Sequence, residues 1–366
     1  TTATTATTTT TTTTIASSRR SPLVAIDLSG AKLAGRGGAG AFVDALLEEA
    51  PGSARALRYL ALAHLPLDSH DVSALPRMLL CGARGAGEAG CALTHLDLSY
   101  CGSLTRNDVM RVPIDGLAEV CPHLVELNLH GLGLLSGFAF DTSGWRQQLT
   151  GALDAVRVSR GAVFRRLRVL KVSTISVPTD RDVRWGRSVV TREQLQVLLR
   201  DCNELRHLDL TGCSRCDWHS IHQEAAAWAE ASSAEPMLQG SIQLEEFLPF
   251  AGALCNLRTL VLARSGMCTD ALLRTLLLRP EWFATLEHLD VSHGAHVTDV
   301  GLYCLAHFPN LQHLVASATS ISNVGLYLCL CALPRLREVE LAVCRGLSRD
   351  VRVRTAQLGV RELRQY

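Results

Sequence analysis

The chain has 366 residues, of which 47% are hydrophobic and 19% are charged, and its formal net charge is +1. This composition is ordinary for a soluble protein and excludes the strongly basic surface typical of many nucleic-acid-binding proteins. The longest apolar run, Val324 to Leu333, is too short to span a bilayer, so we expect neither a nucleic-acid partner nor membrane insertion.

The first twenty residues are mostly threonine. They contain too few apolar side chains to offset the entropy of ordering, so we expect a disordered tail over residues 1–20. Arg19 and Arg20 follow this acid-free segment, as in some organellar transit peptides.

From residue 21 to about residue 350, a six-residue pattern returns ten times, and we call each copy a hexad. It consists of a leucine, two variable residues, an aliphatic residue, one variable residue and a second aliphatic residue. The hexads begin at Leu23, Leu57, Leu93, Leu124, Leu167, Leu205, Leu257, Leu286, Leu311 and Leu336. A pattern repeated every 25 residues or a little more predicts a solenoid in which each hexad is a short parallel strand.

Helices are expected on the opposite side of this sheet. Thr298 and Ser322 each stand just before an amphipathic stretch, Val300 to His307 and Val324 to Cys331. A hydroxyl residue in that place is a helix N-cap signal. Thr269 and Ser348 repeat it.

The spacing of the hexads varies from 25 residues, between Leu286 and Leu311, to 52 residues, between Leu205 and Leu257. Extra residues in a solenoid loop out on one face, often the binding face, and the largest insertion covers about residues 213–256. Tryptophan in such loops favours protein contacts, so we predict partner-binding residues in the insertions at Trp145, Trp185, Trp218 and Trp228. Residues 351–366 are expected to be a C-terminal cap or tail.

The thirteen cysteines indicate a reducing compartment, because a chain of this length does not need disulfides for stability. Cys101, Cys213 and Cys344 each fall eight residues after the first leucine of a hexad, and Cys121 and Cys202 fall three residues before one. Together with the Thr-Asp-x-Gly-Leu helix starts, these positions resemble the cysteine-containing subfamily of leucine-rich repeat proteins.

The resemblance implies an α/β horseshoe with parallel strands on the concave face and helices on the convex face. It also implies a binding role, because this subfamily occurs in the substrate-binding parts of F-box ubiquitin-ligase receptors and in related scaffold proteins. No F-box-like segment is visible in this chain. The location expected from composition and cysteines is intracellular, cytoplasmic or nuclear, with the mitochondrion as an alternative.

On the concave face, variable positions of successive hexads should form columns of arginine, histidine and aspartate. We predict a docking surface for a protein partner here, for a helix or an extended peptide; the alternative is a solvated face with cross-strand charge pairs. The predicted residues are Arg58, Tyr59, His95, Asp97, Glu126, Arg168, Lys171, Arg206, His207, Asp209, Arg258, His288, Asp290, His313, Arg337 and Glu338.

Candidate catalytic and metal sites are weak. Cys213, Cys216, His219 and His222 are a possible zinc ligand set, but their spacing is much tighter than that of a zinc finger. The glycine-rich segments at residues 35–40 and 82–87 lack the lysine and hydroxyl residue of a phosphate-binding loop. We therefore predict no catalytic residue, no metal and no cofactor.

The expected function is that of a noncatalytic scaffold, monomeric on its own, that binds a protein or a larger complex. The alternatives are the substrate-recognition part of a ubiquitin ligase and a regulator of an enzyme such as a small GTPase.

Overall fold

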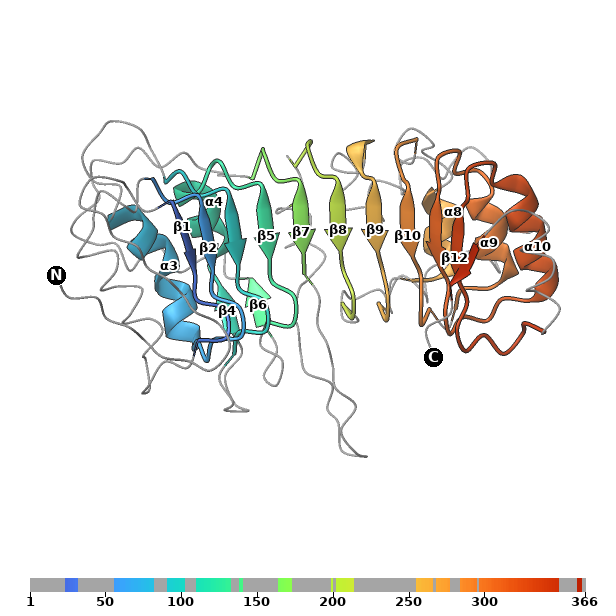
Figure 1. The fold of residues 1–366 in the computed structure, drawn as a ribbon, viewed down its shortest axis with the longest axis horizontal. Coiled ribbons are helices and arrows are strands. Elements are labelled where there is room, and N and C mark those ends of the chain that lie inside the picture. Colours follow the sequence, from blue (N-terminus) through green and yellow to red (C-terminus); the bar gives the residue numbers. More distant parts are fainter. Residues whose placement is uncertain are drawn as a thin grey trace, which may run out of the picture. The chain divides into compact units, whose positions relative to one another are not determined.

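The computed structural model describes residues 24–31, 56–81, 91–102, 110–132, 138–140, 164–172, 199, 202–213, 255–265, 268–276, 284–294, 296–348 and 361–363 (Figure 1). The predicted tail 1–20, both glycine-rich segments and nearly all of the insertion at 213–256 lie outside these residues. So do most of residues 351–366, the four predicted tryptophans, and Cys216, His219 and His222 of the zinc hypothesis. The described residues belong to two compact units, the first made of Thr1–Leu167 and Ser176–Arg187, the second of Arg168–Ile175 and Ser188–Tyr366.

The first unit contains a parallel sheet of four strands in chain order, which are β1 (Ala25–Asp27), β2 (Tyr59–Ala61), β3 (His95–Asp97) and β5 (Glu126–Asn128). Its described helices are α3 (Ser69–Cys81) and α4 (Ile114–Val120). A second, two-stranded parallel sheet pairs β4 (Met110–Val112) with β6 (Phe138–Phe140), and the hexad pattern does not predict it.

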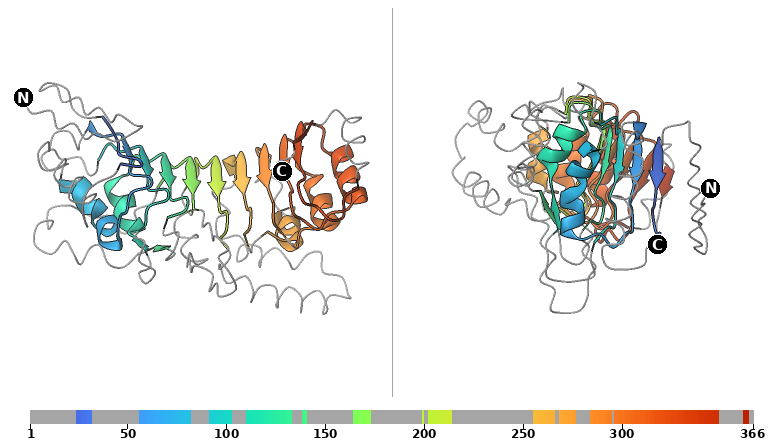
Figure 2. Two further views of the ribbon diagram at one scale, coloured as in Figure 1. Left: turned by 60° about the horizontal axis from the view of Figure 1, so that its bottom comes forward. Right: turned by 90° about the vertical axis from the view of Figure 1, so that its left-hand side faces the viewer.

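The second unit contains seven parallel strands in chain order. They are β7 (Val169–Lys171), β8 (His207–Asp209), β9 (Thr259–Val261), β10 (His288–Asp290), β11 (His313–Val315), β12 (Glu338–Glu340) and β13 (Arg361–Leu363). Helices α8 (Asp270–Leu276), α9 (Asp299–Leu305) and α10 (Asn323–Ala332) lie together on one face of this sheet (Figure 2). All ten hexads are therefore strands, and the predicted α/β solenoid is confirmed.

Strand β13 has no hexad. It pairs with β12 in the register Val339↔Glu362, so that a glutamate stands where the other strands have the central aliphatic residue. The aliphatic pattern therefore could not indicate this strand, which was assigned in the sequence to a cap or tail.

The core follows from the two-residue alternation of the strands. In β3, β5 and β7 to β12 the middle residue is buried and the residues on either side are half-exposed. Leu208 and Leu289 are both 0% exposed. Successive side chains of a strand point to opposite faces. One face of these strands is therefore aliphatic and buried, and the other is mostly polar and half-exposed. We call the half-exposed one the polar sheet face.

Cysteines stand in the turns after three strands and form hydrogen bonds to the preceding repeat. The thiol of Cys101 donates to the carbonyl oxygen of Leu62 at 2.8 Å, that of Cys213 to Val172 at 2.9 Å, and that of Cys344 to Ala316 at 3.1 Å. Each acceptor is the last residue of the preceding hexad. These cysteines therefore link one repeat to the previous one as weak hydrogen-bond donors, which gives the cysteine positions in the sequence a structural role.

We expect native-state alkylation to divide the cysteines by burial. Cys255 and Cys331 are exposed, whereas burial raises the pKa of the Cys101, Cys268 and Cys329 thiols to about 12. Because the thiolate is the reactive form, iodoacetamide at about pH 8 should modify the first two and spare the other three. Mass spectrometry of tryptic peptides measures the labelling, and the same reaction in guanidinium chloride should label all five. Labelling of Cys101 as fast as Cys255 would contradict the fold.

Hydrogen bonds join the starts of the helices across neighbouring repeats. Thr298 caps α9 by accepting from the backbone N–H of Val300, and Ser322 caps α10 by accepting from that of Val324. Asp299 accepts from both the backbone N–H of Ser322, at 2.7 Å, and its hydroxyl, at 2.6 Å. The predicted caps at Thr298 and Ser322 are thus confirmed. The aspartate that begins one helix also holds the cap of the next, and the same arrangement joins Asp270 to Thr298.

Candidate functional site

The polar sheet face brings the predicted residues together in rows, one residue from each strand. In the first unit the register aligns Tyr59, His95 and Glu126. In the second unit it aligns His207, Thr259, His288, His313 and Glu338. Asp97, Lys171, Asp209 and Asp290 lie two residues further along their strands, and Arg58, Arg168, Arg206, Arg258 and Arg337 lie immediately before theirs. Within each unit, residues distant in sequence therefore share one surface.

In the first unit this surface is aromatic and acidic. The rings of Tyr59 and His95 have centroids 6.0 Å apart, and Tyr59 is 39% exposed. Partial burial raises the pKa of Tyr59, and the carboxylates of Asp27, Asp97 and Glu126 add to this shift. The hydroxyl of Tyr59 therefore stays protonated and can donate a hydrogen bond to a partner.

A second aromatic group lies in the turns after the strands of the first unit. It was not predicted from the sequence. The ring of Tyr100 stacks on His64 at a centroid distance of 4.7 Å and meets the edge of His130 at 5.1 Å. His64 and Tyr100 both have positive φ angles, 61° and 55°. Such a backbone is uncommon for residues other than glycine, and in each case the N–H donates to a carbonyl of the next repeat, Ser99 and His130 respectively.

The signal for these turns is present in the sequence. Each positive-φ residue stands seven positions after the first leucine of its hexad, and the residue there is glycine in three other repeats, at Gly30, Gly131 and Gly212. A recurrent glycine at one repeat position indicates a left-handed turn. The turn points the residue at that position away from the strand, so His64 and Tyr100 extend the exposed surface beyond the strand end.

The aspartates of the polar sheet face have a structural task that the sequence analysis did not assign. Asp97, Asp209 and Asp290 each accept a hydrogen bond from the backbone N–H two residues later, at 2.8, 2.9 and 2.8 Å. This closes the turn after the strand, as short polar side chains often do. These carboxylates are therefore partly engaged within the chain.

In the second unit, two histidines and a glutamate form a chain across three strands. The rings of His288 and His313 lie 5.8 Å apart, and Nδ1 of His313 is 2.9 Å from a carboxylate oxygen of Glu338. Burial lowers the pKa of His288, the charge of a protonated His313 lowers it further, and Asp290 opposes the shift. His288 is therefore neutral at neutral pH and can both donate and accept hydrogen bonds.

The lowered pKa of His288 predicts a dependence of stability on pH. The unfolded chain binds a proton at this imidazole near the ordinary value of 6.5, and the folded protein binds it only at lower pH. Stability from this group is therefore fully present above about pH 7 and is lost as pH falls through about 6.5 toward the folded-state pKa. His288→Gln should lose less stability than the wild type between about pH 7 and 5, measured by urea unfolding. The exposed His123→Gln serves as the control, and an unchanged slope in His288→Gln would refute the assignment.

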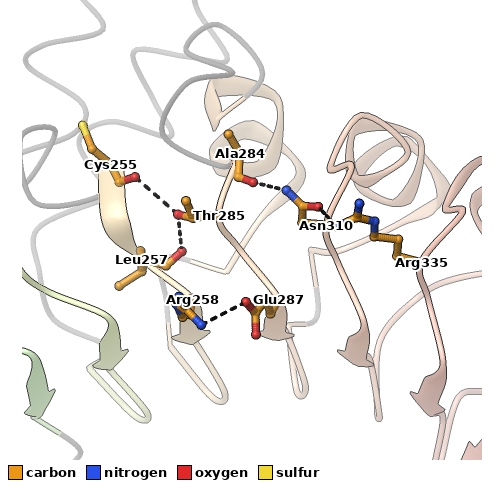
Figure 3. A network of polar contacts seen from close by, with 8 residues as sticks. All are labelled: Cys255, Leu257, Arg258, Ala284, Thr285, Glu287, Asn310 and Arg335. Carbon is orange, nitrogen blue, oxygen red and sulfur yellow. Dashed lines mark hydrogen bonds and ion pairs between the residues drawn. The ribbon is translucent and has the colours of Figure 1, made fainter.

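Before the strands, a line of polar residues connects successive repeats (Figure 3). The hydroxyl of Thr285 lies 2.9 Å from the carbonyl oxygen of Leu257, and the amide of Asn310 donates to Ala284. Nη1 of Arg335 donates to Oδ1 of Asn310 at 2.5 Å. Beside this line, Nη1 of Arg258 pairs with Glu287 at 3.4 Å. These contacts fix the N-terminal edge of the sheet, where the arginines of the polar sheet face stand.

Within the described part of the chain, Asp68, His70 and Asp71 are the group whose ligand atoms lie as close as those of a metal site. Asp68 and Asp71 already accept each other's backbone N–H, at 2.8 and 3.1 Å. This reciprocal pair is a capping box at the start of α3, which accounts for the two carboxylates without a metal. Among the described helices, we find none whose length and apolar character would let it cross a bilayer.

Parallel strands that recur with the hexads, helices on one face and capped helix starts define an α/β leucine-rich repeat solenoid. A family model described as a leucine-rich repeat matches residues 284–306, which contain β10 and α9. In this segment the chain is similar to leucine-rich repeat proteins.

Three solved structures are similar to this chain at low identity. The LRR protein LIC12759 of Leptospira interrogans is 13% identical, with a TM-score of 0.39 over 86% of this chain and 62% of that one. TLR13 in its complex with ssRNA13 is 16% identical, with a TM-score of 0.43 over 86% of this chain and 34% of that one. Rad7 in the yeast complex with Elc1 is 10% identical, with a TM-score of 0.20 over 88% and 87%. The chain thus spans less than two thirds of the first two proteins, and these similarities carry no argument about what it binds. No significant relative is found among curated proteins.

Proposed function

We propose that this chain is a noncatalytic scaffold that binds a protein partner across the polar sheet face. The observation that supports this proposal is the regular alternation on eight strands, where a buried aliphatic residue is flanked by half-exposed residues, most of them polar. An open sheet of parallel strands presents many side chains at fixed spacing, which suits recognition of an extended or helical segment.

Affinity purification of the full chain tests the proposal. The variants Arg206→Glu and His288→Ala should each reduce the recovery of specific partners while changing the free energy of unfolding by no more than about 0.5 kcal/mol. Arg274→Glu is the matched control, because Arg274 is exposed on α8, among the helices and away from the polar sheet face. If Arg274→Glu loses partners and the two sheet variants keep them, the binding surface is on the helical side and the proposal is wrong.

The finer predictions from the sequence are part of the same proposal. Membership in the cysteine-containing subfamily is supported by the thiol hydrogen bonds of Cys101, Cys213 and Cys344. A ubiquitin-ligase receptor or a regulator of a small GTPase would use the same kind of surface. Recovery of ligase subunits or of a GTPase in the purification would favour one of these over a scaffold, and an intracellular location would suit all three.

A further inference from the structure

Three arginines occupy the same position immediately before three neighbouring strands of the second unit. They are Arg168, Arg206 and Arg258, before β7, β8 and β9, and we call them the arginine row. The backbone N–H of Arg206 donates to Arg168 and that of Arg258 donates to Arg206, both at 2.8 Å. Their backbones are therefore one strand spacing apart, about 4.8 Å, and the row is about 10 Å long.

Like charges on adjacent strands repel each other, so a row of three requires compensation. Both ends of the row have it. Nε and Nη2 of Arg168 lie 3.0 and 2.9 Å from one oxygen of Glu204, and Arg258 pairs with Glu287 at 3.4 Å (Figure 3). Among the residues that the structure describes, no acidic side chain pairs with Arg206, the exposed arginine in the middle.

The residues around the row carry one further positive charge, Lys171, and one negative charge, Asp209. The next position on the three strands holds Val169, His207 and Thr259, and β7 adds Lys171. The carboxylate of Asp209 accepts from the N–H and the hydroxyl of Thr211 through the same oxygen, at 2.9 and 2.6 Å. The central guanidinium therefore lies in the most cationic part of the polar sheet face.

The row is also local. The position before the strand is held by Val24, Arg58, Thr94 and Val125 in the first unit, and by Glu287, Gln312 and Arg337 before β10, β11 and β12. Three adjacent arginines occur only before β7, β8 and β9 among these positions. The part of the polar sheet face at β7 to β9 therefore attracts anions, whereas the other described positions carry charges of both signs or none.

We propose that the arginine row binds an acidic, extended segment of the protein partner, rich in aspartate or glutamate, that crosses β7 to β9. This inference rests on the proposed function and specifies the partner's chemistry at one part of the surface. A carboxylate of the segment binds Arg206. Neighbouring carboxylates of the segment replace Glu204 and Glu287 as the partners of Arg168 and Arg258. Residues three apart in an extended chain are separated by about 10 Å, which matches the length of the row.

Carboxylates are favoured over the phosphates of a nucleic acid for two reasons. The arginines at both ends already bind carboxylates, and those acids, with Asp290 nearby, repel a polymer that carries a charge at every unit. The whole chain has a formal net charge of only +1, so it lacks the general attraction that nucleic-acid binding needs.

Fluorescence anisotropy with the full chain tests the inference. The probes are a fluorescein-labelled peptide of ten glutamates and a matched peptide of ten glutamines, each at about 20 mM and about 150 mM salt. We expect the glutamate peptide to bind, more weakly at the higher salt, and the glutamine peptide not to bind. Arg206→Gln should weaken binding about fivefold, as expected for one charge pair. Arg274→Gln removes the same charge from α8, away from this face, and should leave binding unchanged.

A variant that is expected to strengthen peptide binding provides a second test. Glu204→Gln frees Arg168 from its internal partner and should strengthen binding of the glutamate peptide. Equal weakening by Arg206→Gln and Arg274→Gln, no binding of the glutamate peptide, or equal or tighter binding of an oligothymidylate would each overturn the inference. If partners are still lost from the Arg206→Glu and His288→Ala chains in the affinity purification while the peptide fails to bind, only the acidic-segment inference fails. If the sheet variants keep their partners, the proposed function itself fails.

Discussion

Replacing Leu289 with alanine is expected to lower the free energy of unfolding by about 2–5 kcal/mol, the usual range for a buried leucine. Leu289 is 0% exposed and is the central residue of β10, where it lies in register with Leu260 on β9 and Leu314 on β11. The truncation leaves a cavity between two repeats that the rigid backbone ladder cannot close.

Urea unfolding followed by circular dichroism measures the effect. Arg206→Ala is the control, since this side chain is exposed and precedes β8, two strands away from β10, and we expect a change within about 0.5 kcal/mol. A loss below about 1 kcal/mol for Leu289→Ala would mean that the aliphatic face of the sheet is not the core.

Asp299→Ala should destabilise the protein by about 2–4 kcal/mol, because two hydrogen bonds to a charged group are lost at once. Asp299 accepts from the N–H of Ser322 at 2.7 Å and from its hydroxyl at 2.6 Å, so the same carboxylate holds the residue that caps α10. Without it, a backbone donor at the start of the helix loses its partner and the cap loses its orientation.

Thermal unfolding of Asp299→Ala and Asp299→Asn separates these contributions. The amide keeps one acceptor oxygen and should recover part of the stability. Asp115→Ala is a matched control, since Asp115 is likewise in the first turn of a helix, α4. If Asp299→Ala melts at the wild-type temperature, the contact does not contribute to stability.

The same contact explains a glycine of the repeat pattern. A β-carbon at Gly325 would lie 2.6 Å from the Cβ of Asp299, which real structures do not tolerate. The Thr-Asp-x-Gly-Leu pattern therefore has one physical explanation: the aspartate of one repeat enters the space that the glycine of the next repeat leaves open. We expect Gly325→Ala to be destabilising as well.

The ten strands that coincide with hexads were predictable from the sequence, because each depends on a local rule. A leucine-led hexad with aliphatic residues at alternating positions has one low-energy arrangement, which is a strand with one buried face. Thr298 and Ser322 likewise indicated their helices through capping, which involves only residues within one turn. Strand β13 escaped prediction since Glu362 replaces the aliphatic residue, and its pairing with β12 depends on a neighbouring strand instead of its own pattern.

For the candidate site, the sequence predicted which residues lie side by side on neighbouring strands, but not which of them pair with one another. The register that aligns His288 with His313 follows from the repeat, so the sequence was sufficient to place them together. The allocation of hydrogen bonds within a row was not predictable. Asp209 and Arg206 look equally available in the sequence, yet one carboxylate oxygen closes a turn while the guanidinium has no acidic partner among the described residues.

By itself, then, the sequence determined the repeat, its strands, its helix caps and the identity of the exposed rows, since all of these follow from short-range periodicity and capping. Only the tertiary structure decided which charges neutralise one another, which histidine is partly buried, and which cysteines act as donors between repeats. These depend on distances between side chains of different repeats, and such distances are set by packing that no single repeat contains.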